Sequence, residues 1–223
     1  MNKQNFTLSF GLEKFFDFVV YIHRKKMYKI ISPALNSNSM ESILDIGSTS
    51  DTGKSSNAFL YFFSAKYVAS ISDQDITEGT KIKFPNVNFI KGDGLSLTFA
   101  DSSFDFVFSN AVLEHVGGID KVRQFISESI RVTNNKVIII TPNRWFPLET
   151  HTKLLFLHWL PPKYFRYMLN KLGMKFFSKE ENLNLLSKSQ INKIVEDLSP
   201  SSFNISYIKF MGYPSNIVLE INK

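Results

Sequence analysis

The sequence predicts an α/β fold with a mostly parallel sheet and helices on both of its faces. Short apolar runs that look like strands alternate with longer segments of helical periodicity, as in folds built from βαβ units. The segment Val137–Ile140 is apolar at every position, which is typical of a central strand covered on both faces. The chain has 223 residues, of which 43% are hydrophobic, enough for one domain with a substantial core.

The first predicted element is a helix near the N-terminus. Its apolar positions recur at helical spacing and form one stripe, which consists of Leu12, Phe15, Phe16, Val19 and Ile22. A basic cluster follows at residues 23–29. We expect residues 1–35 to form a basic amphipathic helical segment, whose basic end lies in solvent or touches anionic lipid. Residues 36–223 are expected to form the rest of the protein.

The elements of residues 36–223 follow from apolar runs, periodicity and the turn residues between them. Strands are expected near residues 42–46, 67–71, 87–91, 104–109, 136–141, 203–210 and 215–222. Helices are expected near residues 55–65, 119–132 and 187–198. An insertion at about residues 145–173, rich in aromatic residues and proline, breaks the alternation. No internal repeat or Gly/Ser linker divides the chain, so we expect one domain.

Composition excludes several classes of protein. The chain has no cysteine, which excludes disulfides, thiolate catalysis and cysteine-based metal sites. The N-terminus lacks the apolar run of a secretion signal, and no apolar stretch reaches the roughly 20 residues that span a bilayer. We therefore expect a cytoplasmic protein. The formal net charge is +6, but no aromatic-and-basic recognition motif accompanies it, so no nucleic-acid partner is expected.

The most informative segment is the predicted first strand with the loop after it, Ser42-Ile-Leu-Asp-Ile-Gly-Ser-Thr-Ser-Asp-Thr-Gly-Lys-Ser55. An apolar strand, a glycine turn and a helix N-terminus let a nucleotide-like ligand approach the backbone closely. The end of this segment, Gly53-Lys-Ser55, is similar to a phosphate-binding loop. The first glycine of that motif would then fall on Ser48, so a P-loop-like phosphotransferase or NTPase is the weaker interpretation.

Further motifs follow this loop in order. Leu44-Asp-Ile-Gly47 precedes Lys91-Gly-Asp-Gly94 and the segment Phe104–Val116. The order continues with Thr141–Phe146, His151, His158–Pro161, Lys179–Leu183 and Gly212–Asn216. The set resembles the type 11 group of class I S-adenosylmethionine-dependent methyltransferases over roughly residues 40–222. It is similar to bacterial members of that group that are linked to cell-surface polysaccharide genes.

The resemblance implies a Rossmann-like class I methyltransferase fold with a seven-stranded sheet whose last two strands are antiparallel. It also implies S-adenosyl-L-methionine as the cofactor. The residues expected to bind the cofactor follow strand ends and are Asp45, Gly47, Ser48, Thr49, Gly53, Asp73, Asp93, Gly94 and Asn110. Asp73 lies 20 residues beyond Gly53, the separation expected for a ribose-binding acid, and Asp75 is the alternative.

Histidines are the predicted catalytic residues, because methyl transfer to a hydroxyl needs a base. An imidazole with a pKa of about 6.5 suits that task near neutral pH. His115 follows the predicted fourth strand, where an acceptor approaches. The alternative is a structural histidine that is packed against the pocket wall or bonded to Glu114. His151 and His158 in the insertion are the alternatives.

No metal is predicted. Glu114-His115 is similar to part of the metal site of ubiquinone O-methyltransferases. The additional upstream carboxylate of those enzymes is absent, because Ala111 and Val112 occupy the preceding positions.

The expected function is transfer of a methyl group to an oxygen of a small-molecule or glycan-like acceptor. The insertion is expected to cap the acceptor pocket, with Trp145, His151 and Trp159 facing the substrate. The alternatives are a helical hairpin packed wholly into the core, or an apolar face that contacts a membrane peripherally. A catalytically silent domain that binds only the cofactor is a further alternative. The oligomeric state is not predicted.

Overall fold

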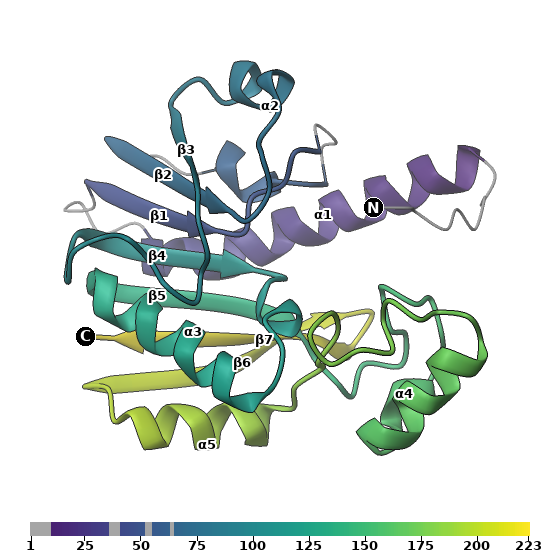
Figure 1. The fold of residues 1–223 in the computed structure, drawn as a ribbon. Coiled ribbons are helices and arrows are strands. Elements are labelled where there is room, and N and C mark those ends of the chain that lie inside the picture. Colours follow the sequence, from purple (N-terminus) through teal and green to yellow (C-terminus); the bar gives the residue numbers. More distant parts are fainter. Residues whose placement is uncertain (1–9, 36–40, 52–54, 63–64) are drawn as a thin grey trace.

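The computed structural model describes residues 10–35, 41–51, 55–62 and 65–223, with only the backbone described for residues 10–18, 34 and 35. Within this part of the chain, seven strands form one sheet in the order β3-β2-β1-β4-β5-β7-β6 (Figure 1). The strands are β1 (Ser42–Ile46), β2 (Tyr67–Ser72), β3 (Val87–Lys91), β4 (Phe104–Asn110), β5 (Thr133–Pro142), β6 (Ser202–Phe210) and β7 (Tyr213–Asn222). Each predicted strand is confirmed.

The pairing makes this a mixed sheet rather than a purely parallel one. Strands β3, β2, β1, β4 and β5 pair in parallel, whereas β7 is antiparallel to both β5 and β6. The predicted antiparallel pairing of the last two strands is therefore confirmed. Because β1 pairs with both β2 and β4, the strand order reverses beside β1. Open α/β sheets bind ligands at such a point, beyond the carboxyl ends of the strands.

Two helices that the sequence predicts cover one face of the sheet, α3 (Ile119–Val132) and α5 (Lys188–Leu198) (Figure 1). Helix α3 buries Val122, Phe125 and Ile126 in the cluster that also contains Leu44 and Ile139 of the central strands. Helix α5 begins at a capping box of Ser187 and Gln190, which pairs backbone donors that the first turn leaves free.

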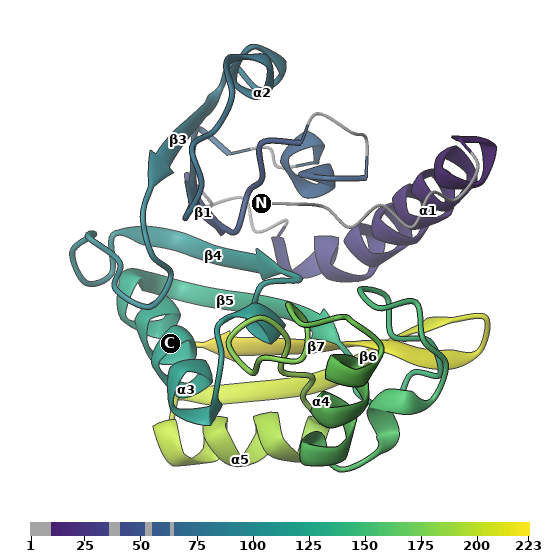
Figure 2. The same ribbon diagram turned by 45° about the vertical axis from the view of Figure 1, so that its right-hand side comes forward.

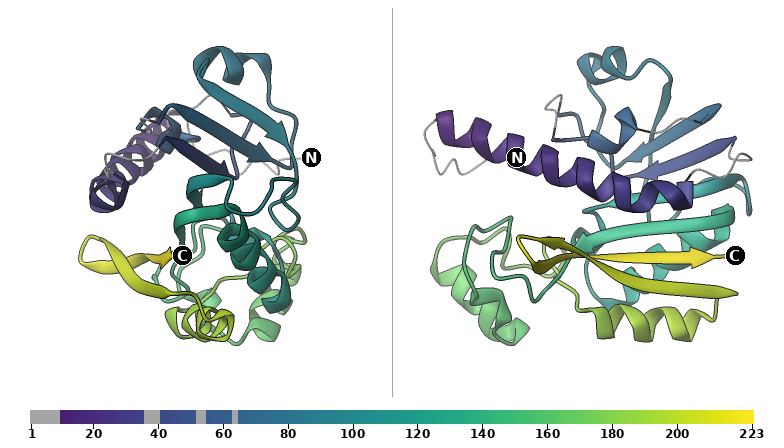
Figure 3. Two further views of the ribbon diagram at one scale, coloured as in Figure 1. Left: turned by 90° about the vertical axis from the view of Figure 1, so that its left-hand side faces the viewer. Right: turned by 180° about the vertical axis from the view of Figure 1, so that it is seen from behind.

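The opposite face is covered by α1 (Phe10–Leu35) and by the short 3₁₀ helix η1 (Ala58–Tyr61) (Figure 3). Met27 and Ile31 of α1 pack with Phe106 and Phe108 of β4 and with Phe59 of η1. The N-terminal turns of α1 extend past the carboxyl ends of β4 and β5 (Figures 1 and 3). None of the described helices has both the length and the hydropathy that a membrane span requires.

The structure corrects the helix predicted at residues 55–65. Among the described residues of that range, only Ala58–Tyr61 is helical. Asn57 has a φ of 41°, and its side chain is hydrogen-bonded to the amide and carbonyl of Thr49 at 2.9 and 2.8 Å. Asn57 is therefore held in the left-handed region by the loop after β1, so a regular helix cannot pass through it. A further helix, α2 (Glu78–Lys83), was not predicted.

Residues 143–186 connect β5 to α5, and we call them the β5–α5 segment. Asn143 at its start pairs with Leu186 at its end. It contains η3 (Leu157–Trp159) and α4 (Pro162–Lys171), and the predicted insertion at about residues 145–173 falls within it. Its apolar side chains form a small core of their own, built on Phe165, Leu169, Leu183 and Leu185. Figure 2 shows the segment beyond the carboxyl ends of β4 and β5.

Candidate active site

The loop after β1 turns at Gly47. Gly47 has a φ of +108°, and an added Cβ would lie 2.1 Å from Cγ2 of Val112, so a side chain is excluded here. The amides of Gly47 and Ser48 donate to the carbonyl oxygen of Ile71 at 2.8 and 3.3 Å, which holds the loop against the end of β2. The predicted glycine turn is therefore present, whereas Gly53 lies outside the described residues.

Asp45 is a buried carboxylate near the end of β1. Its Oδ2 accepts a hydrogen bond from Ser70 Oγ at 2.7 Å. Burial raises the pKa of Asp45 to about 6, although the hydrogen bond from Ser70 acts in the opposite direction. A cationic group bound beside Asp45 would stabilise its charged form, because an opposite charge offsets the cost of burial.

A cavity of about 130 Å³ lies where the strand order reverses. Its lining includes Asp45, Gly47, Thr49, Asn110 and Arg24. The structure thus brings together four of the residues predicted to bind the cofactor. Ser48, next to this lining, has a buried Oγ without a hydrogen-bond partner among the described residues. Buried hydroxyls are normally paired, so a bound ligand is a natural partner for this one.

Arg24 is a lining residue that the sequence interpretation missed. It belongs to the basic cluster at residues 23–29, which was expected to lie in solvent or on lipid. In the structure, Nη1 of Arg24 donates to the carbonyl oxygen of Ser55. Burial lowers the pKa of Arg24, and the charge of Glu114 partly offsets this. The signal that was missed is helical spacing: Arg24, Met27 and Ile31 lie on the same face of the helix, so Arg24 points toward the protein interior with them.

The remaining predicted cofactor residues lie outside the cavity lining. Asp73 is exposed directly after β2, and the alternative, Asp75, forms an ion pair with Lys91 at 2.8 Å. Asp93 is exposed after β3, and its Oδ1 accepts the amide of Leu95 at 2.9 Å. These acids follow neighbouring strands of the sheet, and Lys91 already engages Asp75. Asp73 is therefore the better candidate for the ribose hydroxyls.

Gly94 has a packing reason to be glycine. A Cβ added there would lie 2.7 Å from Cε2 of Phe125 and 3.1 Å from Cγ2 of Ile46. The close approach of this backbone to α3 therefore requires a glycine whether or not a cofactor binds. The role of Gly94 in cofactor binding stays a prediction.

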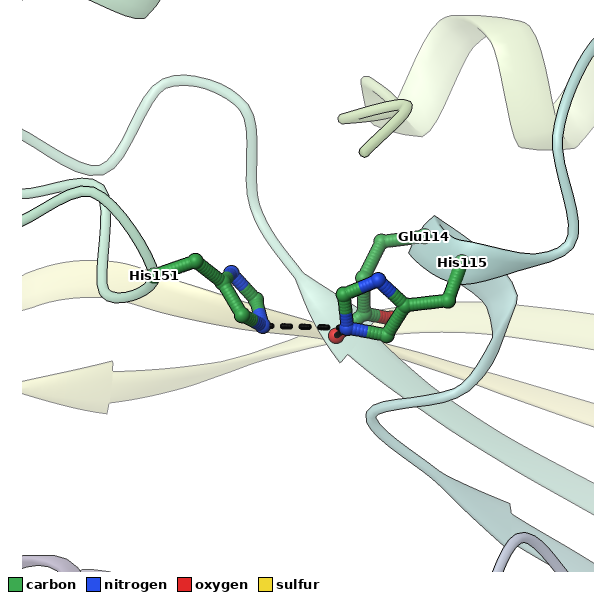
Figure 4. A group of neighbouring side chains, drawn as sticks. All are labelled: Glu114, His115 and His151. Atoms are coloured by element: carbon green, nitrogen blue, oxygen red, sulfur yellow. Dashed lines mark hydrogen bonds and ion pairs between the residues drawn. The ribbon is translucent and has the colours of Figure 1, made fainter. Parts of the chain in front are cut away.

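The structure brings the two predicted catalytic histidines into contact. His115 lies in the 3₁₀ helix η2 (Leu113–His115), and His151 lies in the β5–α5 segment. Their Nε2 atoms are 3.1 Å apart, and their rings meet edge to face (Figure 4). The residues are 36 positions apart in the chain, so the pair exists only in the folded protein.

Each imidazole is oriented through its other nitrogen. Nδ1 of His115 lies 2.7 Å from the carbonyl oxygen of Asn182, and Nδ1 of His151 lies 2.7 Å from Oε1 of Glu149. Burial opposes charge on Glu149, but hydrogen bonds from His151 and Thr152 and the charge of His151 lower its pKa to about 2. Burial likewise opposes charge on His151, but Glu149 outweighs it and raises the pKa of that imidazole.

Glu114 completes the group in Figure 4. Its side chain is fully buried, and Oε2 accepts a hydrogen bond from Thr141 Oγ1 at 3.0 Å. Oε1 has no hydrogen-bond partner among the described residues and lies 4.0 Å from Nε2 of His115. Glu114, His115 and His151 therefore direct three polar atoms toward one small volume.

The other predicted residues of the insertion differ in their surroundings. His158 is buried, and its Nε2 lies 2.7 Å from the carbonyl oxygen of Phe146, so its position is explained by packing. Burial lowers the pKa of this imidazole. Trp145 and Trp159 are 52% and 41% exposed, with ring centroids 6.4 Å apart. The two tryptophans therefore present apolar rings to the outside rather than filling the core.

Part of the chain is similar to the methyltransferase domain family. The family model matches residues 44–141, whereas a comparison with curated proteins finds no match. Among solved structures, the chain is similar to magnesium protoporphyrin IX methyltransferase from Synechocystis with bound S-adenosylhomocysteine. The identity is 15% and the TM-score 0.59, over 98% of this chain and 90% of that chain.

Two further solved structures are similar. The N-methyltransferase NodS from Bradyrhizobium japonicum, in complex with S-adenosylhomocysteine, has 11% identity and a TM-score of 0.55, over 89% of this chain and 86% of that one. A SAM-dependent methyltransferase from Aquifex aeolicus has 15% identity and a TM-score of 0.55, over 87% of each chain.

Sequence identities this low establish a shared fold and do not identify the methyl acceptor. The predicted Rossmann-like fold is confirmed in its mixed-sheet form, and the domain match confirms S-adenosylmethionine as the cofactor. The match also favours a methyltransferase over the phosphate-loop interpretation of the first loop. Residues 44–141 of this chain match a methyltransferase domain, and they lie within a class I methyltransferase fold.

Proposed function

We propose that the protein transfers the methyl group of S-adenosylmethionine to an oxygen of a small or glycan-like acceptor. The observation that carries this proposal is the His115–His151 pair, with Nε2 atoms 3.1 Å apart. A hydroxyl acceptor must lose a proton as it attacks, and a positioned imidazole pair provides a base for it. The glycan-like acceptor rests on the resemblance to bacterial methyltransferases linked to cell-surface polysaccharide genes.

The chemistry needs little from the protein beyond positioning, because the sulfonium already makes the methyl group electrophilic. The acceptor oxygen forms a bond to the methyl carbon while the carbon–sulfur bond breaks and S-adenosylhomocysteine leaves. The hydroxyl proton goes to Nε2 of His115, which is 35% exposed and so open to an acceptor. His151, held by ionised Glu149 at 2.7 Å, shares and stabilises the positive charge that results.

The cofactor is proposed to bind through charges that match its methionine part. Asp45, whose pKa is raised to about 6, faces the α-ammonium group, and Arg24 faces the α-carboxylate. The unpaired Oγ of Ser48 supplies a further polar contact. Asp73 binds the ribose hydroxyls, and Asp93 lies near the adenine. The cofactor thus spans the ends of β1, β2 and β3.

The acceptor is proposed to bind between the cofactor and the β5–α5 segment. His151 belongs to this segment, and Trp145 and Trp159 are exposed on it. Aromatic rings offer flat apolar surfaces against which an acceptor can pack. A segment of this kind excludes water from the transfer and selects the acceptor without touching the cofactor.

A peripheral membrane contact is a second proposal and rests on α4. The helix exposes Tyr164, Tyr167 and Met168 beside the basic residues Lys163 and Lys171. Exposed aromatic and basic side chains on one helix favour the surface of an anionic membrane. The intact protein should then float with vesicles that contain anionic lipid and stay behind with neutral ones. Failure to float with the anionic vesicles would rule the contact out.

The proposed function is tested by titration calorimetry and by a transfer assay. S-adenosylhomocysteine should bind the wild-type protein, and Asp73→Ala and Asp93→Ala should weaken binding about ten- to a hundredfold, the value of a charged hydrogen bond. Unchanged affinity in both variants would contradict the assignment, and tight triphosphate binding would favour a phosphotransferase. With methyl-labelled cofactor, the label should appear on hydroxyl-bearing acceptors.

A further inference from the structure

We propose that Glu114, His115 and His151 bind one divalent transition-metal ion. Oε1 of Glu114 and the Nε2 atoms of both histidines lie within 4.8 Å of one another, on elements that are far apart in the sequence (Figure 4). The site opens toward solvent on the side of His115, which is 35% exposed. Nε2 of His115 cannot hold an ion and a proton at once, so the base proposed above is the ion-free form of the histidine pair. Ion binding itself does not depend on methyl transfer.

The two imidazoles have conflicting hydrogen-bond needs. Nδ1 of His115 faces a carbonyl oxygen and Nδ1 of His151 faces a carboxylate, each at 2.7 Å, so both Nδ1 atoms carry the hydrogen. In the neutral state both Nε2 atoms are then acceptors, yet they lie 3.1 Å apart with their lone pairs in the same space. Two acceptors at this distance repel unless a positive species, a proton or a metal ion, lies between them.

Glu114 favours a metal ion over a proton. A proton between the histidines satisfies both Nε2 atoms, but Oε1 of Glu114 lies 4.0 Å from His115 Nε2, too far for a hydrogen bond. That oxygen is fully buried and has no other partner among the described residues. A buried carboxylate oxygen without a partner is costly. A single cation bound by all three atoms would satisfy both Nε2 lone pairs and this oxygen at once.

The surrounding groups resemble those of metal-bound histidines. Such histidines usually donate their second N–H to a carboxylate or a backbone carbonyl, which fixes the tautomer and the ring orientation. Glu149 and the carbonyl of Asn182 occupy these two positions. Glu149 is itself held by the amides of His151 and Thr152 at 2.9 and 2.5 Å. Oε2 of Glu114 is likewise fixed by Thr141.

The donor set points to the class of ion. Two imidazoles and one carboxylate suit zinc and similar divalent metals, whereas magnesium and calcium prefer oxygen ligands only. Zinc–nitrogen bonds of about 2.0–2.1 Å place tetrahedral ligands roughly 3.3 Å apart. The two histidine Nε2 atoms are already close to this spacing at 3.1 Å, whereas Oε1 of Glu114, 4.0 Å from His115 Nε2, must move inward when the ion binds. Three protein ligands leave a coordination position open. An acceptor hydroxyl bound there would lose its proton to water more readily.

The sequence argument against a metal covers only ligands close to Glu114 in the chain. That argument required a third ligand just upstream of Glu114, where Ala111 and Val112 stand. The structure supplies His151 from the β5–α5 segment instead, through a contact that no local motif reveals. The earlier expectation of no metal therefore considered only part of the available ligands.

The test uses tag-free protein, treated with a chelator and then dialysed. Zinc chloride is titrated by calorimetry, and cobalt chloride by visible absorption, which reports tetrahedral nitrogen and oxygen ligands. One equivalent of each metal should bind. His151→Ala and Glu114→Gln should each lower the affinity at least a hundredfold, and Glu149→Gln should lower it ten- to a hundredfold. Circular dichroism checks that each variant is folded, and Glu114→Gln keeps the shape of the side chain.

The control variant is His23→Gln, since His23 lies near Asn216 and outside the cluster. The chain has four histidines and no cysteine, so this control separates the proposed site from weak binding elsewhere. His23→Gln should keep one equivalent at unchanged affinity. Failure of the wild-type protein to bind zinc or cobalt would overturn the proposal and leave a proton-sharing histidine pair. Binding that survives both His151→Ala and Glu114→Gln would overturn it as well.

Discussion

The two sides of the proposed active site, one for the cofactor and one for the acceptor, are built in different ways. The cofactor side consists of residues such as Asp45, Gly47 and Asn110, which end strands at the centre of the sheet. The acceptor side depends on the β5–α5 segment, which has a small core of its own. It is joined to the loop after β4 by hydrogen bonds such as that from the Asn184 amide to the Glu114 carbonyl oxygen, at 2.7 Å.

We expect this difference to separate cofactor binding from acceptor selection. The buried part of the cofactor side, such as Asp45, shares its packing with the main core, so a change there disturbs the fold and cofactor binding together. The acceptor side packs mainly within its own segment, so a change there can alter acceptor selection and leave the sheet intact.

Replacing residues 150–162 with a short polar loop should have the largest effect. It removes His151 and Trp159, so methyl transfer should fall below detection. The affinity for S-adenosylhomocysteine, measured by calorimetry, should stay within about twofold, because the cavity is lined by other elements. A folded variant with full activity on the native acceptor would refute the role of the segment.

His115→Ala should lower turnover about 10²–10⁴-fold, the usual contribution of a general base. The affinity for S-adenosylhomocysteine should not change, because His115 does not line the cavity. His23→Gln is the matched control and should keep its turnover. Near-normal turnover of the His115→Ala variant would move the role of base to His151 or remove it altogether.

Asp45 should make the stability of the ligand-free protein depend on pH. Its pKa is about 6 in the folded state and 3.8 in the reference state, so the folded protein binds the proton more tightly. The resulting stabilisation is present below pH 4 and is lost as pH rises through 6. The shift corresponds to about 3 kcal/mol. Between pH 4 and 7, urea unfolding should show this loss in the wild-type protein relative to Asp45→Asn, because Glu149 and His151 contribute the same pH dependence to both proteins.

If Asp45→Asn instead shows the same pH dependence as the wild-type protein, the carboxylate is not buried as described. The same variant should weaken cofactor binding at pH 7.5, because it removes the charge proposed to face the ammonium group.

Arg24→Gln should lower the affinity for S-adenosylhomocysteine about ten- to a hundredfold, since a charged hydrogen bond contributes roughly 1.5–3 kcal/mol. Lys25 and Lys26 are exposed neighbours in the same basic cluster, so Lys25→Gln and Lys26→Gln are matched controls of equal charge change. Calorimetry on the three variants measures the difference. An equal, small loss of affinity in all three variants would mean that Arg24 acts only through its positive charge and makes no specific contact with the ligand.

The cofactor side was the easier one to predict from sequence. An apolar strand followed by Gly47 has a local cause, because the positive φ and the approach of Val112 demand glycine. The strands and the helices α3 and α5 likewise follow from local periodicity. The helix at 55–65 was wrong because Asn57 is engaged by Thr49, a contact that periodicity does not reveal.

The acceptor side could be predicted only in part. His115 and His151 were each recognised as candidates, but their contact, and the buried position of Glu114 beside them, depend on how the β5–α5 segment folds back. Arg24 was missed because a basic cluster is usually solvated. Its helical spacing from Met27 and Ile31 carried the signal that it faces inward.

The most direct test of the account is a crystal structure of the protein with S-adenosylhomocysteine bound. The account predicts that the methionine part occupies the cavity beside Asp45, with its carboxylate at Arg24. The sulfur atom should then face His115 and His151. A ligand bound outside this cavity, or one whose sulfur faces away from the histidine pair, would contradict the account.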